Sequence, residues 1–294
     1  MRVLIAGCGY VGVPLGGELI RQGHDVFGLC RSAGSLERLA AAGIRPLCAD
    51  ITRLESLKVL SADFDWVVNC AASGGGGAAA YEQTYLTGNR NLLEWLRPSP
   101  PRQFIYTSST SVYAQDDGSP VSEADLVEPG TQTGKILVAT EQLLLSAVPL
   151  FPATILRLAG IYGPERGYWL RNYLSGEASL DGDGGRFLNM VHRDDVVGAV
   201  VAALQRASGG EVFNVVDDEP VSQRAVFEWL ASRLGQPHPA AAPENVARGR
   251  PRLVTNKRVS NLRFKTKTNY SFKYPSFREG YEAEIQCMLA AGQL

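Results

Sequence analysis

Short apolar runs alternate with amphipathic segments along the first half of the chain. The apolar runs predict strands over residues 3–6, 26–29, 45–48, 66–71, 104–107 and 154–158. The segments between them have helical spacing of their apolar positions and predict helices over residues 11–22, 36–42, 79–96 and 135–146. Strands separated by helices form crossover units, so the pattern predicts an α/β fold with a doubly wound parallel sheet.

A glycine motif joins the first predicted strand to the first predicted helix. Gly7-Cys8-Gly9-Tyr10-Val11-Gly12 matches G-x-G-x-x-G. In this motif the first glycine makes a turn, the second lets the backbone approach a pyrophosphate, and the third lets helix pack on strand. The alternative is a glycine turn without a ligand. Because the motif heads a run of crossover units, we predict a Rossmann-type dinucleotide site that uses Gly7, Gly9, Tyr10, Val11 and Gly12.

The regular alternation ends near residue 158. Beyond it, helical spacing returns over residues 196–205 and 224–234, with Ser222 as a cap and Gly235 as a stop. We predict a dinucleotide-binding domain over residues 1–158. Residues 159–294 are expected to form mainly a smaller C-terminal substrate lobe, with some elements returning to the sheet. The segment 235–251, rich in proline and alanine, is expected to be a surface connection.

The end of the second predicted strand indicates which cofactor binds. An NAD site usually has an acidic residue there, which hydrogen-bonds the ribose 2′-hydroxyl. This chain has Arg31 and Ser32 instead, which can pair with a 2′-phosphate, so NADP is favoured over NAD. The alternative is that Arg31 is merely solvated. Asp50 and Ile51 are expected at the adenine, where Asp50 could instead cap a turn, and Ala71 completes the predicted cofactor set.

Composition adds little beyond the cellular setting. The longest apolar runs are broken by glycines or fall short of the ~20 residues of a membrane span, so no membrane partner is expected. The five cysteines are odd in number and scattered, which fits a reducing cytoplasm and does not fit a zinc site. We therefore expect a cytoplasmic protein without a metal.

One stretch of the chain is strongly basic. Residues 245–278 hold ten of the 29 basic residues and none of the acidic ones. The stretch is interpreted either as a binding surface for an anionic small-molecule substrate or as a solvated face. Nucleic acid is a weaker alternative, because the remaining surface is acidic and would repel phosphate, and no nucleic-acid partner is predicted. The oligomeric state is left open, with a dimer allowed.

Several motifs in order resemble the extended short-chain dehydrogenase/reductase family, which includes nucleotide-sugar epimerases and dehydratases. The resemblance spans nearly the whole chain. Its glycine loop is one residue shorter than in most extended members, as in a subset of atypical ones. The motifs are the glycine loop, Ala49-Asp50-Ile51, the strand from Phe104 to Tyr113, Arg157 with Ile161-Tyr162-Gly163-Pro164, and Val191-His192-Arg193-Asp194-Asp195-Val196.

The resemblance also implies an incomplete catalytic set. The family uses a Tyr and a Lys four residues apart on one helix, so that the cation lowers the phenol pKa and the phenol exchanges a proton with substrate. Here Thr133 falls at the Tyr position and Leu137 at the Lys position. The family's Ser is kept as Ser109, and its Asn position falls on Tyr85. Ser109 and Tyr85 are therefore the candidate catalytic residues.

Other side chains give weaker signals. Lys135 is a candidate for a substitute proton-transfer group. His192 is either a general base or a structural hydrogen-bonding residue. Tyr81 and Tyr85 share a helix face, which either faces the nicotinamide or packs in the core. Residues 74–77, four glycines, form either a mobile loop over the cofactor or a slack connection.

Two functions of different classes remain open at this point. The first is an atypical NADP-dependent oxidoreductase or epimerase that acts on a small or nucleotide-linked substrate. The second is a non-catalytic protein that senses NADP or docks to a partner. The retained Ser strand and the predicted substrate lobe favour the enzyme, and the missing Tyr and Lys favour the sensor.

Overall fold

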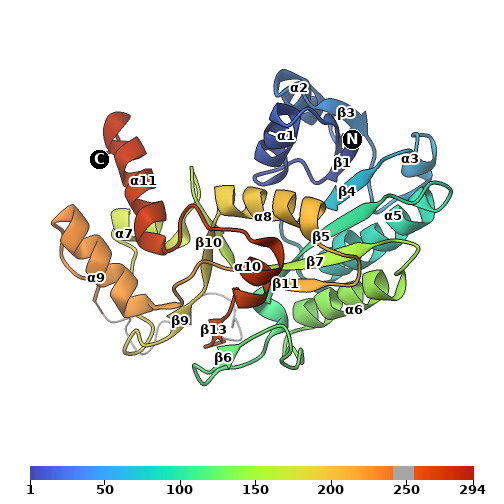
Figure 1. Ribbon diagram of the computed structural model, residues 1–294. Helices are drawn as coiled ribbons and strands as arrows, with labels where there is room; N and C mark the ends of the chain where they lie inside the picture. Colours follow the sequence, from blue (N-terminus) through green and yellow to red (C-terminus); the bar gives the residue numbers. More distant parts are fainter. Residues whose placement is uncertain (241–254) are drawn as a thin grey trace.

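Seven parallel strands form the central sheet of the computed structural model, which describes residues 1–240 and 255–294 (Figure 1). Their order across the sheet is β11-β7-β5-β4-β1-β2-β3. The predicted doubly wound α/β fold is confirmed. The chain reverses its direction of travel between β1 and β4, which is where open sheets of this kind bind ligands. The strands are β1 (Arg2–Ala6), β2 (Asp25–Cys30), β3 (Arg45–Cys48), β4 (Trp66–Asn69), β5 (Gln103–Ser109), β7 (Ala153–Leu158) and β11 (Val212–Val215).

Helices cover both faces of this sheet. On one face, α1 (Gly12–Arg21) and α8 (Arg193–Arg206) pack their apolar sides, including Leu15, Leu19 and Val200, against the strands. On the other face lie α3 (Leu54–Lys58), α5 (Gly88–Leu96) and α6 (Gln132–Ser146). Except for the edge strand β3, whose residues are exposed or half-buried, the strand interiors are therefore buried from both sides. Helix α2 (Ala33–Ala41) connects β2 to β3.

A smaller lobe stands beside the sheet and has its own apolar core (Figure 1). Leu170, Phe227 and Phe277 are among the buried side chains of that core. Its elements are β8 (Gly160–Tyr162), α7 (Tyr168–Leu174), β9 (Phe187–Leu188), β10 (Met190–His192), β12 (Val221–Ser222), α9 (Gln223–Leu234) and α11 (Phe277–Ala290). Three shorter elements are β6 (Pro120–Val121), β13 (Arg258–Val259), which pairs with β6, and α10 (Leu262–Thr268).

The structure corrects the predicted helix over residues 79–96. That stretch consists of α4 (Gly77–Tyr81), a π-helical turn η1 (Glu82–Thr87) and α5. The four glycines before it all have positive φ, so they form an irregular entry to α4. A π-helical turn widens a helix locally and often lies at a functional site.

The second half of the chain was incompletely predicted. Strand β11 pairs with β7 and α8 covers the sheet; both follow residue 158, from where some elements were expected to return to the sheet. The elements α7, α10, α11 and β11 of this half, and α3 of the first half, were not predicted, because each is short or has mixed periodicity. Gly235 ends α9 with a φ of 63°, as expected of a helix stop. The predicted connection 235–251 lies outside the described residues from position 241 onward.

The described parts of the chain contain neither a candidate membrane-spanning helix nor a candidate metal site. No helix within residues 1–240 or 255–294 is long and apolar enough to cross a membrane. Within the same ranges, no three His, Cys, Asp or Glu side chains are grouped so that they could hold a metal ion.

Candidate functional site

A cavity of about 960 Å³ opens at the carboxyl ends of β1, β2, β3, β4, β5 and β7. We call it the sheet-edge cavity. It contains every predicted cofactor and catalytic residue except Gly12, which lies just behind it at the start of α1. The predicted residues that line it are Gly7, Gly9, Tyr10, Val11, Arg31, Ser32, Asp50, Ile51, Ala71, Tyr85 and Ser109.

The three glycines of the loop are required for different reasons. Gly7 has a φ of 94°, and a Cβ atom on it would lie 2.3 Å from the Ala71 nitrogen. A Cβ on Gly12 would lie 2.4 Å from the Gly7 oxygen. Both positions are therefore dictated by the packing of the loop on its own neighbours. A Cβ on Gly9 would meet no atom within 4 Å. With no side chain at this position, the backbone itself lines the cavity.

Tyr10 belongs to the glycine loop, and its ring contacts two arginine side chains. The Arg166 guanidinium lies 5.0 Å from the centre of the Tyr10 ring, and that of Arg193 lies 5.3 Å from it. Burial raises the pKa of Tyr10 to about 12, so its phenol is neutral at neutral pH. Arg166 also lines the sheet-edge cavity, and sequence reasoning missed it. Arg166 follows β8, in a segment where the sequence predicted no helix or strand, so no local signal pointed to it.

The end of β2 presents a polar surface without a carboxylate. Arg31 is exposed, and Ser32 and Ser35 lie next to each other with their hydroxyl oxygens 2.8 Å apart. All three line the cavity, although Ser35 was not predicted. Asp50 is the one carboxylate among the described lining residues. Its Oδ1 accepts hydrogen bonds from the Thr52 amide and hydroxyl, so Asp50 also caps a turn, which was the alternative interpretation.

Ser109 and Tyr85 reach the same cavity from different elements. Ser109 ends β5, and its Oγ accepts a hydrogen bond from the Ser111 amide at 3.1 Å. Tyr85 lies in the π-helical turn, and its carbonyl accepts a hydrogen bond from Asn89 Nδ2 at 2.7 Å. The rings of Tyr81 and Tyr85 lie 4.9 Å apart, and both residues line the cavity.

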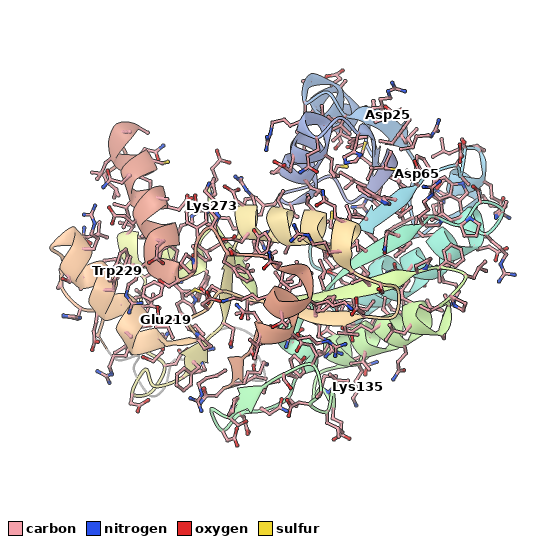
Figure 2. All side chains as sticks on the ribbon, in the orientation of Figure 1. Asp25, Asp65, Lys135, Glu219, Trp229 and Lys273 are labelled. Carbon is pink, nitrogen blue, oxygen red and sulfur yellow. The ribbon has the colours of Figure 1, made fainter. Side chains whose placement is uncertain are left out.

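Helix α6 contributes nothing to the cavity wall. Leu137 is buried against Val112 and Val121, and the Thr133 hydroxyl donates to that of Thr131. Lys135 is an exposed residue of α6 and lies toward the lower edge of the molecule in Figure 2. A role for Lys135 as a substitute proton-transfer group is therefore not supported.

A buried ion pair anchors the strand that carries Ser109. Arg157 of β7 and Glu141 of α6 are bonded through two contacts to Oε2 and one to Oε1, the shortest being 2.7 Å from Nη2 to Oε2. The Ser108 hydroxyl donates to Glu141 Oε1 at 2.6 Å. Arg157 Nη1 also donates to the Tyr113 hydroxyl, which donates to Asn214. The network ties β5, β7, β11 and α6 together directly behind the cavity.

His192 is a structural residue in this fold. Its Nδ1 accepts a hydrogen bond from the Asp194 amide at 3.1 Å and so caps α8. Its ring is buried, with its centre 3.9 Å from that of Tyr274. His192 lines neither the sheet-edge cavity nor the cavity described next, which argues against the alternative of a general base.

A second cavity of about 330 Å³ continues from the first into the lobe. We call it the lobe cavity. The two share Ser109, Ala159, Gly160 and Ile161. Its described lining residues include no Asp or Glu. Its aromatic lining residues are Tyr162, Tyr168, Trp169, Phe187 and Tyr281, and its cationic ones are Arg186 and Lys257.

The basic stretch 245–278 contributes one residue to the lobe cavity, and others of its residues form ion pairs elsewhere. Lys257 enters the lobe cavity. Lys265, Lys267 and Arg278 form ion pairs with acidic residues outside the stretch. Arg248, Arg250 and Arg252 lie outside the described residues.

Together, the fold and the joined cavities define a Rossmann-fold dinucleotide-binding protein with an adjoining ligand cavity. The comparisons with known proteins give the family. Residues 3–216 match the model of the NAD dependent epimerase/dehydratase family, and the chain belongs to that family. The predicted resemblance is thereby confirmed.

Three relatives show the range of this similarity. Protein YeeZ of Escherichia coli (strain K12) is 28% identical, over 93% of this chain and 96% of its own. The 3-diazoavenalumate denitrifying reductase of a Streptomyces species is 30% identical, over 97% of this chain and all of its own. A solved structure of an epimerase/dehydratase-family protein from Methylobacillus flagellatus is 32% identical, covers 98% of both chains and has a TM-score of 0.80. With reductases and epimerases among the relatives, the non-catalytic alternative is not favoured.

Proposed function

We propose that this protein is an oxidoreductase that transfers hydride between NADP and a small substrate held in the lobe cavity. The observation that carries the proposal is the junction of the two cavities at Ser109, Ala159, Gly160 and Ile161. A dinucleotide extended along the sheet edge and a substrate in the lobe would meet there. The bare surface over Gly9 fits the close approach of a pyrophosphate.

The chain's own residues supply the rest of this mechanism. The bound nicotinamide supplies the hydride. The loop amides and the start of α1 would hold its pyrophosphate, and Arg166, which lines the same cavity, would add a positive charge. Ser109 orients the oxygen of the substrate, and the Tyr85 phenol donates or accepts its proton. Thr133 and Leu137 stand at the positions of the Tyr and Lys that the family usually carries on one helix. Both lie outside the two cavities, so this mechanism gives them no role.

Turnover tests this proposal directly. Purified protein is assayed with NADPH against aldehydes and ketones by the loss of NADPH absorbance, and with NADP⁺ against nucleotide sugars by its gain. We expect oxidation of NADPH with at least one carbonyl substrate. Stable NADPH across the whole panel, with tight cofactor binding, would instead support the non-catalytic alternative.

Cofactor choice is the first prediction. NADPH is expected to bind more tightly than NADH, because Arg31, Ser32 and Ser35 can hold a 2′-phosphate and no carboxylate at the end of β2 repels it. Replacing Arg31 with alanine should remove most of the preference, since a charge-assisted hydrogen bond contributes about 1.5–3 kcal/mol, or roughly tenfold to a hundredfold in affinity. Fluorescence titration measures both affinities. Arg21→Ala, at the far end of α1, is the control, and equal affinities in the unaltered protein would exclude the NADP preference.

The second prediction concerns the reacting groups. Ser109→Ala and Tyr85→Phe should each lower kcat/KM by roughly a hundredfold, because each removes a hydroxyl from the cavity wall. NADPH affinity should stay unchanged. Thr133→Ala is the matched control: it alters the family's usual Tyr position but lies outside both cavities, so it should leave turnover intact. A substrate whose turnover is indifferent to both cavity variants would contradict these roles.

A further inference from the structure

Lys257 is a buried cation that forms no ion pair with a carboxylate of residues 1–240 or 255–294. Only 4% of the residue is exposed. Its Nζ donates to the Tyr113 carbonyl oxygen and to Thr255 Oγ1, both at 2.9 Å. Among the described residues no Asp or Glu forms an ion pair with it. Lysine is almost never buried without such a partner, because removing its charge from water is costly. The arrangement leaves the ammonium charge uncompensated.

The place of Lys257 indicates where a compensating charge would come from. It lines the lobe cavity, together with five aromatic side chains and no described carboxylate. The other cation there, Arg186, is already paired with Asp181 at 3.1 Å. Among the described residues of this aromatic-walled cavity, Lys257 is therefore the cation without an ion-pair partner. Burial lowers the pKa of Lys257 to about 8, so most of the amine is still protonated at pH 7.

We infer that the lobe cavity binds a planar aromatic or conjugated carboxylate, with its carboxylate on Lys257 and its ring among the aromatic side chains. A single uncompensated cation matches a singly charged carboxylate better than a diphosphate. The small volume of about 330 Å³ favours the same choice. This inference rests on the proposed function, because it names the substrate class for the same cavity. The end of the ligand opposite its carboxylate lies toward Ser109.

Equilibrium binding tests this without any turnover. Calorimetry compares 2-naphthoate and cinnamate with their primary amides, which have the same shape but no charge, in the presence and absence of NADP⁺. At pH 7 each acid should bind at least ~10-fold more tightly than its amide. Lys257→Met, nearly equal in size but uncharged, should abolish the difference and leave amide binding unchanged. Lys265→Met, which removes the same charge from a half-buried lysine outside both cavities, is the control.

The pH dependence gives a second readout on the unaltered protein. A bound carboxylate favours the protonated amine, so the advantage of acid over amide is full between the carboxyl pKa of the ligand, about 4, and about pH 8, and declines as the pH rises through the upper value. This measurement remains decisive if the Lys257→Met protein does not fold.

Three outcomes overturn the inference. These are equal binding of acid and amide, an advantage of the acid that survives Lys257→Met in a folded protein, or Lys257-dependent binding of UDP-glucose in preference to the aryl acids. Its failure is distinct from that of the proposed function. Lys257-dependent acid binding without any hydride transfer overturns only the function, and turnover of uncharged carbonyl compounds without acid binding overturns only the substrate class.

Discussion

Replacing Gly9 with valine is expected to abolish dinucleotide binding while the protein stays folded. A Cβ at this position meets no protein atom within 4 Å, so the new side chain is tolerated by the fold and projects into the sheet-edge cavity. The pyrophosphate of the cofactor needs that space. NADPH affinity should fall by at least ~100-fold, since displacing the phosphates removes several hydrogen bonds at once. Fluorescence titration gives the affinity, and circular dichroism checks the fold.

Two other glycines make this experiment selective. Gly17→Val puts the same side chain on α1 at a position that also has no atom within 4 Å, and it should leave binding unchanged. Gly7→Val should fail to fold, because its Cβ would clash with Ala71 and its φ of 94° disfavours a side chain. If the Gly9→Val protein binds NADPH normally, the loop is only a turn.

Removing the Glu141 carboxylate is expected to cause a large loss of stability in a protein that still folds. Glu141→Ala would leave the Arg157 guanidinium buried with its charge unpaired, and would also deprive the Ser108 hydroxyl of its acceptor. Breaking one side of a buried ion pair typically costs about 3–5 kcal/mol in free energy of unfolding. Urea denaturation followed by circular dichroism measures this loss.

An exposed ion pair supplies the control for that variant. Glu55 and Lys58 are paired at 2.8 Å, but their side chains are 82% and 51% exposed. Glu55→Ala should therefore cost less than about 1 kcal/mol. A Glu141→Ala loss as small as this would show that the buried network does not hold β5 in place. Replacing Glu141 and Arg157 together with Leu and Met should recover much of the loss, since no charge is then left buried.

The first half of the fold and the residues of the sheet-edge cavity could be predicted because their signals are local. Each buried parallel strand is an apolar run, and the spacing of the loop glycines is a motif of six consecutive residues, although the Ala71 contact that requires Gly7 is long-range. Arg31 and Ser32 follow β2 directly, so predicting the end of that strand was enough to predict that they line the cavity. Tyr85 was found by motif position, but the π-helical turn around it was not, because widening a helix by one residue leaves no clear periodicity.

The lobe cavity depended on tertiary structure. Lys257 and Arg186 stand in segments without regular elements, far apart in the chain, and each resembles an ordinary surface cation in sequence. Folding pairs Arg186 with Asp181 and encloses Lys257 beneath the Tyr113 carbonyl. The sequence alone therefore determined the nucleotide-binding half, where function follows from backbone geometry encoded over short stretches. Only the tertiary structure decided which basic residue is left unpaired in a cavity, because burial and charge compensation are set by long-range contacts.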